Sequence, residues 1–147
     1  MSDKTQIDPM IVDIEESFRW VCGKIKKKGR EILSDFEITP PQFEALQHLI
    51  KEGELTIGEL SGKMFLACST VTDLLDRMER NDLVVRVKDE KDRRIVRIRV
   101  LEKGHNLLEE VLYTRRKYLE NVVSDLGQDG IANIRDVFSA LNERMEI

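Results

Sequence analysis

The stretch LVVRVKDEKDRRIVRIRV, residues 83–100, decides the fold of this chain. In residues 83–88 and again in residues 95–100, apolar residues alternate with basic ones, as they do in strands with one buried face. The six residues between them, 89–94, are all charged, which favours a protruding turn. We therefore predict a short β-hairpin with a charged tip.

Two short helices and a third helix with a polar face precede this hairpin. Residues 39–42 and 56–59 each have the spacing of a capping box, so a helix should begin after Thr39 and after Thr56, and Gly53 should end the first of them. After a turn near residues 65–67, the third helix should bury one face and expose the other. The buried face is Val71, Leu74, Leu75 and Met78, and the polar face is Ser69, Thr72, Asp73 and Asp76, with Thr70 and Arg77 at its margins. This order of elements is typical of a winged helix-turn-helix.

Long helices are predicted at both ends of the chain. The first should begin at Pro9, capped by Asp8, and a last helix should follow a break at residues 127–130, which ends a helix over residues 102–126. Both terminal helices have more apolar residues than one small core needs, so we predict a homodimer. These residues are Ile11, Ile14, Phe18, Val21, Ile25 and Ile32 in the first helix, and Ile131, Ile134, Val137, Phe138, Leu141 and Met145 in the last.

Composition excludes several classes of protein. The chain has 147 residues, 41% hydrophobic and 35% charged, and lacks the apolar run of ~18–20 residues that spans a membrane, so a cytoplasmic protein is expected. We find no glycine-rich phosphate loop, no nucleophile elbow and no cluster of metal ligands, so we expect neither an enzyme nor a cofactor or metal. The two distant cysteines, Cys22 and Cys68, do not indicate a disulfide.

The charge distribution indicates a polyanionic partner, although the net charge is −4. Residues 86–99 contain seven basic and three acidic residues, which leaves a local charge of +4. Such a basic stripe is what contacts with DNA phosphates require. A charged hairpin that is merely solvated is the alternative interpretation.

Taken together, residues 60–104 resemble the MarR family of bacterial and archaeal regulators. The resemblance is carried by STVTDLLDRMER at residues 69–80, by LVVR at residues 83–86, by Asp92-Arg93-Arg94 at the hairpin tip and by Glu102-Lys103-Gly104. Three positions depart from the family pattern. Asn81-Asp82 stands where the family usually has a glycine, Ala67 where it has a serine cap, and Leu101 where it has a threonine.

The resemblance implies a mainly α fold with a small β-hairpin wing. Residues 1–36 would form an N-terminal dimerisation helix, residues 37–101 a winged helix-turn-helix DNA-binding domain, and residues 102–147 C-terminal helices that complete the dimerisation region. The implied function is a sequence-specific transcription regulator, a repressor, that binds a pseudo-palindromic operator in double-stranded DNA as a homodimer. A small aromatic or lipophilic effector, or oxidation of a thiol, would release it.

The DNA contacts should come from the polar-faced helix and from the wing. An α-helix fits the major groove, and an arginine at a wing tip can enter the minor groove, where we place Arg94. Asp92 resembles the family's acidic partner, which orients the arginines by an ion pair. The expected contacts are Ser69, Thr70, Thr72, Asp73 and Arg77 on the helix, and Arg86, Lys88, Lys91, Arg93 and Arg94 on the wing.

The residues that would sense a signal are less well defined. Trp20, His48 and Tyr113 could line an effector pocket, but we interpret them as packing residues. Cys22 is interpreted as a core residue. Cys68 is interpreted as a buried packing residue, with a reactive thiol at a helix N-terminus as the alternative.

A winged-helix module that binds proteins and not DNA is the competing function. The hairpin tip discriminates between the two, because a protein-binding module has no need for Arg93 and Arg94 there.

Overall fold

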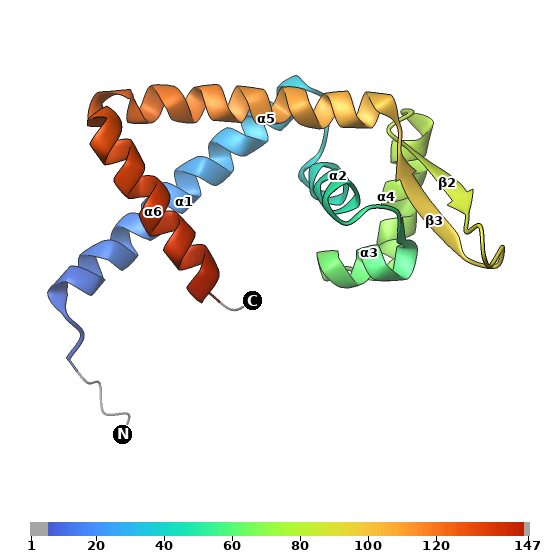
Figure 1. Cartoon of the computed structure of the whole chain (residues 1–147), viewed down its shortest axis with the longest axis horizontal. Helices are drawn as coiled ribbons and strands as arrows, with labels where there is room; N and C mark the ends of the chain where they lie inside the picture. The colour runs from blue at the N-terminus through green and yellow to red at the C-terminus, as the bar shows by residue number, and fades with distance from the viewer. Residues whose placement is uncertain (1–5, 146–147) are drawn as a thin grey trace. The chain divides into compact units, whose positions relative to one another are not determined.

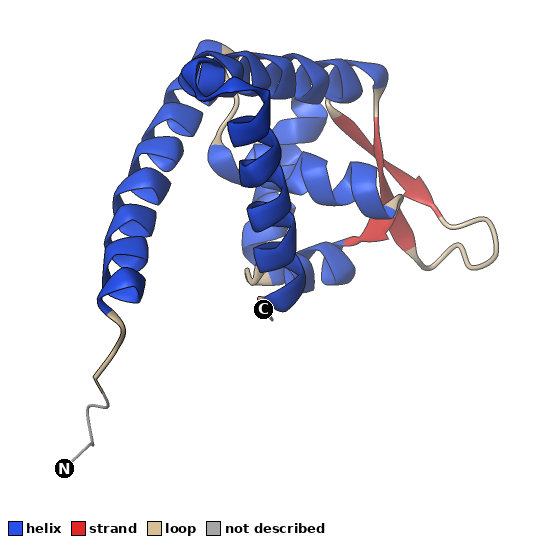
Figure 2. Cartoon of the chain, turned by 60° about the vertical axis from the view of Figure 1, so that its left-hand side comes forward, coloured by secondary structure: helices blue, strands red, loops and turns tan. Residues whose placement is uncertain are grey.

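The computed structural model describes residues 6–145, and they fall into two units, one ending at Val111 and the other beginning at Leu112 (Figure 1). The chain is mainly α-helical with one small antiparallel sheet, as predicted (Figure 2). Its elements are α1 (Pro9–Asp35), α2 (Pro40–Glu52), β1 (Leu55–Thr56), α3 (Ile57–Met64), α4 (Cys68–Arg80), β2 (Val84–Lys88), β3 (Val96–Val100), α5 (Glu102–Val123), the short 3-10 helix η1 (Ser124–Leu126) and α6 (Gly127–Arg144).

Helices α1 and α2 begin where the sequence predicts, at polar caps. The Asp8 carboxylate accepts a hydrogen bond from the backbone N–H of Met10, at 2.8 Å. At α2 the capping box is complete, because Thr39 accepts from the Gln42 N–H and the Gln42 side chain accepts from the Thr39 N–H. Gly53, with a φ of +88°, ends this helix. The prolines and caps thus fix the boundaries of α1 and α2.

Half of the second predicted capping box is formed. Thr56 accepts a hydrogen bond from the Glu59 N–H at 3.1 Å, which caps α3. The Glu59 carboxylate lies 3.6 Å from the guanidinium of Arg97 on β3. The acidic side chain of the motif therefore links α3 to the sheet.

The winged lobe, defined here as residues 38–101, has a well-buried core. Helices α2, α3 and α4 and the sheet each contribute side chains to it, and Leu46, Leu60, Leu75 and Ile98 are completely inaccessible to solvent. This confirms the predicted buried face of α4, although Leu74 is only half-buried. The core residues are Ile38, Phe43, Ala45, Leu46, Leu49, Leu55, Leu60, Met64, Val71, Leu75, Met78, Leu83, Val84 and Ile98.

The sheet has three strands in the order β1-β3-β2, one more than the predicted hairpin. Strand β1 has only two residues, too few to show a periodic pattern, and it pairs Leu55 with Ile98. In β3 the apolar and basic residues separate onto opposite faces, as predicted. In β2 they do not: Arg86 lies opposite buried Ile98, and Val87 lies opposite Arg97. Opposed residues share a face, so Arg86 points toward the helices.

Two turns next to α4 contain non-glycine residues in the left-handed region. Asp82 has a φ of +60°, which confirms that an aspartate can replace the usual glycine before β2. Phe65, between α3 and α4, has a φ of +54° while its ring is 86% exposed. Ala67 provides no side-chain cap for α4, as its identity predicts.

Gly104 explains the Glu102-Lys103-Gly104 motif at the start of α5. A Cβ at this position would lie 2.5 Å from the Leu83 carbonyl oxygen and 2.8 Å from the Val100 side chain. The Leu101 N–H also donates to the Leu83 carbonyl oxygen, at 2.9 Å. Only glycine therefore allows α5 to begin this close to β2.

Helix α1 is unbroken from Pro9 to Asp35 despite its two glycines, and much of its apolar face is exposed. Among its described side chains Ile32 and Leu33 are buried, whereas Ile11, Ile14 and Val21 are 45–52% exposed. Cys22 is exposed as well, so the interpretation of it as a core residue is wrong for the single chain.

The second unit contains the end of α5, η1 and α6, and α6 has no buried residue. Val137 and Phe138 are more than half exposed. The predicted break at residues 127–130 lies a few residues earlier, at η1, and Gly127 takes a φ of +71° to begin α6. In the described part of the chain, residues 6–145, no helix is long and apolar enough to cross a membrane.

Candidate nucleic-acid interface

The polar face of α4 is open to solvent along most of its length. Ser69, Thr70, Asp73 and Arg77 are all exposed. Thr72 is half-buried, and its hydroxyl donates to the Cys68 carbonyl oxygen at 2.9 Å, so only its oxygen lone pairs remain for a partner. This face carries hydroxyl, carboxylate and guanidinium groups that can reach base edges in a major groove.

Arg86 is held against α4 and is less accessible than the bases at the hairpin tip. Its guanidinium contacts Asp76 at 2.7 Å and Glu79 at 3.1 Å, and its side chain is 28% exposed. The structure therefore separates Arg86 from the other predicted wing contacts and places it where it stabilises the packing of β2 on α4.

The wing loop, residues 89–95, is closed by two backbone hydrogen bonds. The Asp89 N–H donates to the Ile95 carbonyl oxygen at 2.9 Å, and the Ile95 N–H donates to the Asp92 carbonyl oxygen at 3.0 Å. The loop thus has a defined conformation in spite of its charged sequence.

Asp92 and Arg94 form an ion pair at the tip of this loop. The Asp92 carboxylate accepts from the backbone N–H, the Nε and the Nη2 of Arg94, each at 3.1 Å. The Arg94 side chain is nevertheless 91% exposed. The guanidinium is therefore held in one orientation while remaining accessible to a large partner.

The same contacts set the ionisation of Asp92. The hydrogen bonds from the Arg94 side chain and then from its backbone N–H hold the pKa of Asp92 below that of an ordinary aspartate. Since the pKa is depressed in the folded state, the ionised pair contributes stability above the ordinary pKa and loses it as the pH falls through the folded value.

The basic stripe divides into bases that bind the protein and bases that face solvent. Arg97 pairs with Asp89 and Glu59, and Arg99 pairs with Glu54. Lys88, Lys91 and Arg93 are exposed, and none of them forms an ion pair within residues 6–145. With Arg94, which pairs with Asp92 but is 91% exposed, they form the exposed basic tip, defined as Lys88, Lys91, Arg93 and Arg94.

Cys68 is exposed at the first residue of α4, so the interpretation of it as a buried packing residue is wrong. Its Sγ lies 3.2 Å from the Oγ of Ser61, a buried residue whose hydroxyl also donates to the Gly58 carbonyl oxygen at 3.0 Å. Cys68 shares the face of α4 that buries Val71 and Leu75, and it is exposed because it lies at the end of that face, in the first residue of the helix.

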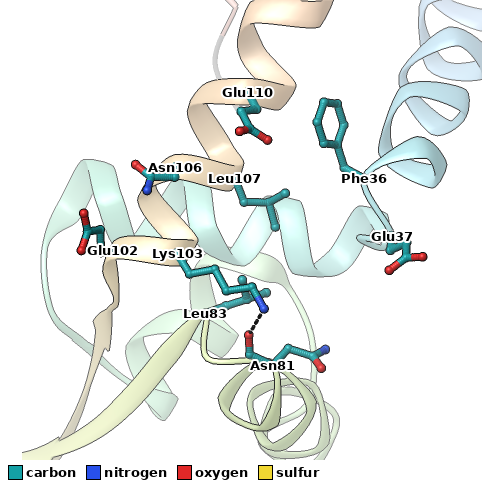
Figure 3. Close-up of a pocket in the computed structure, with 9 residues that line it drawn as sticks. All are labelled: Phe36, Glu37, Asn81, Leu83, Glu102, Lys103, Asn106, Leu107 and Glu110. Atoms are coloured by element: carbon teal, nitrogen blue, oxygen red, sulfur yellow. Dashed lines mark hydrogen bonds between the residues drawn. The ribbon is translucent and has the colours of Figure 1, made fainter.

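None of the three aromatic or imidazole side chains considered for an effector is buried, so the interpretation of Trp20 and Tyr113 as packing residues is wrong for the single chain. Trp20 and Tyr113 are each 63% exposed, and His48 lies 3.7 Å from Glu44 on its own helix. A cavity of about 550 Å³ lies instead between the end of α1, the turn after α4 and the first turns of α5 (Figure 3). Lys103 crosses it to donate to the Asn81 carbonyl oxygen at 2.9 Å. Its lining is Phe36, Glu37, Asn81, Leu83, Glu102, Lys103, Asn106, Leu107 and Glu110.

No part of the described chain offers an evident metal site. Within residues 6–145, no group of three or more histidine, cysteine, aspartate or glutamate side chains is arranged to hold a metal ion.

Comparison with known proteins adds independent findings to this geometry. A sequence profile of the MarR family matches residues 38–96. An uncharacterized HTH-type transcriptional regulator of Bacillus subtilis, YsmB, is 49% identical over 92% of this chain and 93% of its own length. The HTH-type transcriptional repressor MdtR of the same organism is 28% identical over 95% of this chain and 90% of its own.

Solved structures give the same result for the fold. A MarR family protein from Bacillus stearothermophilus superposes with a TM-score of 0.87 and is 47% identical, covering 96% of this chain and 99% of that one. The YusO protein from Bacillus subtilis superposes with a TM-score of 0.78 at 27% identity, covering 96% of this chain and 100% of that one.

Proposed function

The chain belongs to the MarR family of transcriptional regulators, and from this premise we propose that it represses transcription as a homodimer bound to a pseudo-palindromic operator. It is a DNA-binding regulator and not an enzyme. Repression is supported by the name of the relative MdtR, a transcriptional repressor. Because the relatives are transcriptional regulators, DNA binding is a better interpretation than the competing protein-binding function.

Two features of the winged lobe support the proposal most strongly, the exposed basic tip and the exposed polar face of α4. An arginine held by Asp92 yet 91% exposed is suited to a narrow, electronegative minor groove. Ser69, Thr70 and Asp73 at the N-terminal end of α4 would meet base edges in the adjacent major groove. Arg77 lies further along the helix and would contact a phosphate, and Thr72 would accept from a base amine.

The proposed domains separate DNA binding from dimerisation. Residues 37–101 would hold the DNA-binding surface, and residues 1–36 and 102–147 would supply the helices of the dimer. The exposed apolar side chains of α1 and of α6, each considered alone, support a second copy of this chain as their partner. A twofold dimer would present two recognition helices and two wings, which favours an operator with twofold symmetry.

Oxidation of Cys68 is the release mechanism favoured by a specific observation. The thiol is exposed at the first residue of α4, where a bulky or charged adduct would collide with bound DNA. Peroxide should therefore weaken DNA binding by the native protein and leave Cys68→Ser unaffected. An equal loss of binding in both proteins would contradict this mechanism.

A small aromatic or lipophilic effector would have a different site. We propose the cavity of Figure 3, because its lining includes Phe36 and Leu107 as well as the turn that joins α4 to β2. A ligand that displaced Lys103 from the Asn81 carbonyl oxygen would act directly on the end of α4. Phenolic compounds should then raise the melting temperature of the native protein more than that of Phe36→Ala.

Selection of duplexes from a random-sequence pool tests the proposed function directly. The native protein should enrich a pseudo-palindromic sequence, called here the selected duplex. Arg94→Ala should lose roughly 1–3 kcal/mol of binding free energy per half-site and relax the preference at outer A·T positions, since it removes a minor-groove contact. If no sequence is enriched, or if Arg94→Ala binds the selected duplex normally, the proposal is wrong.

A further inference from the structure

The wing loop contains a second aspartate, Asp89, at its base. The Asp89 Oδ1 accepts hydrogen bonds from the backbone N–H groups of Lys91, at 2.8 Å, and Asp92, at 3.1 Å. Its Oδ2 accepts from the Nε of Arg97 at 2.6 Å. The Asp89 side chain is only 17% exposed, compared with 35% for Asp92. One carboxylate therefore organises the first half of the loop and binds it to β3.

Arg97 continues this connection into the body of the winged lobe. Its Nη1 donates to the Glu54 carbonyl oxygen at 3.3 Å and lies 3.6 Å from the Glu59 carboxylate on α3. A chain of contacts thus runs from α3 and the turn before β1, through Arg97 and Asp89, to the backbone of Asp92. Asp92 in turn holds Arg94.

We propose that Asp89 is a positioning residue for DNA recognition, because it fixes the wing loop on the body of the lobe so that Asp92 can hold Arg94. This inference rests on the proposed function, and it adds a residue that does not itself touch DNA. A carboxylate beside a DNA-binding loop repels phosphates, so an electrostatic role alone would make Asp89 unfavourable for binding.

The contacts that Asp89 makes in the loop also favour its ionised form. The hydrogen bond from Arg97, and then those from the N–H groups of Lys91 and Asp92, hold the pKa of Asp89 below its ordinary value. The folded loop therefore favours the ionised carboxylate that pairs with Arg97.

Two substitutions separate the contacts of the Asp89 carboxylate. Asp89→Ala removes the acceptor for both backbone N–H groups and the partner of Arg97. Asp89→Asn retains an oxygen that can accept from the N–H groups and loses the charged partner. Glu90→Gln is the matched control, because it removes one negative charge from the same loop. The Glu90 side chain is exposed and forms no hydrogen bond within residues 6–145.

Fluorescence anisotropy titrations would use the selected duplex and a random-sequence duplex at two salt concentrations. Positioning predicts that Asp89→Ala lowers the ratio of the two affinities by roughly tenfold, and Asp89→Asn by less, since part of the loop is retained. Glu90→Gln should leave that ratio unchanged. If Asp89→Ala leaves this ratio unchanged, as Glu90→Gln does, and binds both duplexes at least as tightly as the native protein, the inference is wrong.

A second background distinguishes positioning from a general loss of structure. In Arg94→Ala protein the arginine that Asp89 positions is absent. Adding Asp89→Ala should therefore have little further effect on the ratio of the two affinities. An undiminished effect in that background would overturn the proposal. Should Asp89→Ala fail to fold, Asp89→Asn and Arg97→Gln provide the same comparison. Native protein that prefers neither duplex would instead contradict the proposed function itself.

Discussion

The winged lobe and the terminal helices have the same kind of periodic apolar pattern, but their apolar side chains differ in burial. In the lobe, Leu46, Leu60 and Leu75 are completely buried by neighbouring elements of the same chain. In α6, where apolar residues recur just as regularly, no side chain is buried. Periodicity therefore predicts that a helix has an apolar face, and it does not tell which molecule covers that face.

The largest effect should come from the core of the winged lobe. Leu46→Ala removes a fully buried side chain, so the free energy of unfolding should fall by about 2–5 kcal/mol. Urea denaturation followed by circular dichroism measures this. Val137→Ala in α6, where the side chain is 56% exposed in one chain, is the matched control when both substitutions are compared in a monomeric variant, and there it should lower the free energy of unfolding much less. Equal losses would remove the contrast between the two regions.

The exposed face of α1 should matter for association and not for the fold of the lobe. Ile14→Glu places a charge on a side chain that is 46% exposed in one chain, and in a dimer interface it should weaken association by at least ~2 kcal/mol. Sedimentation equilibrium should then show a folded monomer at micromolar concentration. Lys26→Gln changes the charge of the same helix by the same amount and should remain dimeric. A native protein that is already monomeric would contradict the dimer.

The smallest effect should occur in the turn between α3 and α4. Phe65→Gly relieves a left-handed backbone while removing a ring that is 86% exposed, so it should raise the free energy of unfolding by about 0.5–1 kcal/mol. Phe65→Ala removes the same ring but keeps the strained Cβ, and it should change stability little. Thermal denaturation of the two variants distinguishes relief of strain from loss of the ring.

Local signals in the sequence predicted most of the fold. Asp8, Thr39 and Gly53 act within one turn of their own helix, so their chemistry determines the helix boundaries directly. Strand β1 could not be predicted, because its two residues are extended only through pairing with β3. The exposure of Cys22 and Cys68 was mispredicted for a related reason: the sequence gives the face of a helix but not what packs on it.

The sequence predicted which basic residues the candidate site contains, and it did not predict which of them form ion pairs with carboxylates. The basic stripe was evident from residues 86–99, yet Arg86 and Arg97 bind carboxylates of α4 and of the wing loop. Asp89 was not singled out, since its role depends on a partner eight residues away across the hairpin. The signal that could have identified it is a second aspartate in the same charged turn, three residues before Asp92.

The most direct test of this account is the affinity of Asp92→Ala for the selected duplex, with Glu90→Gln as the charge-matched control. Simple electrostatics predicts tighter binding when a carboxylate beside DNA is removed. Because Asp92 holds the Arg94 guanidinium through its Nε and Nη2, we expect Asp92→Ala to bind roughly five- to tenfold more weakly while Glu90→Gln does not. If Asp92→Ala binds the selected duplex more tightly than the native protein, the wing does not work by holding Arg94 in place.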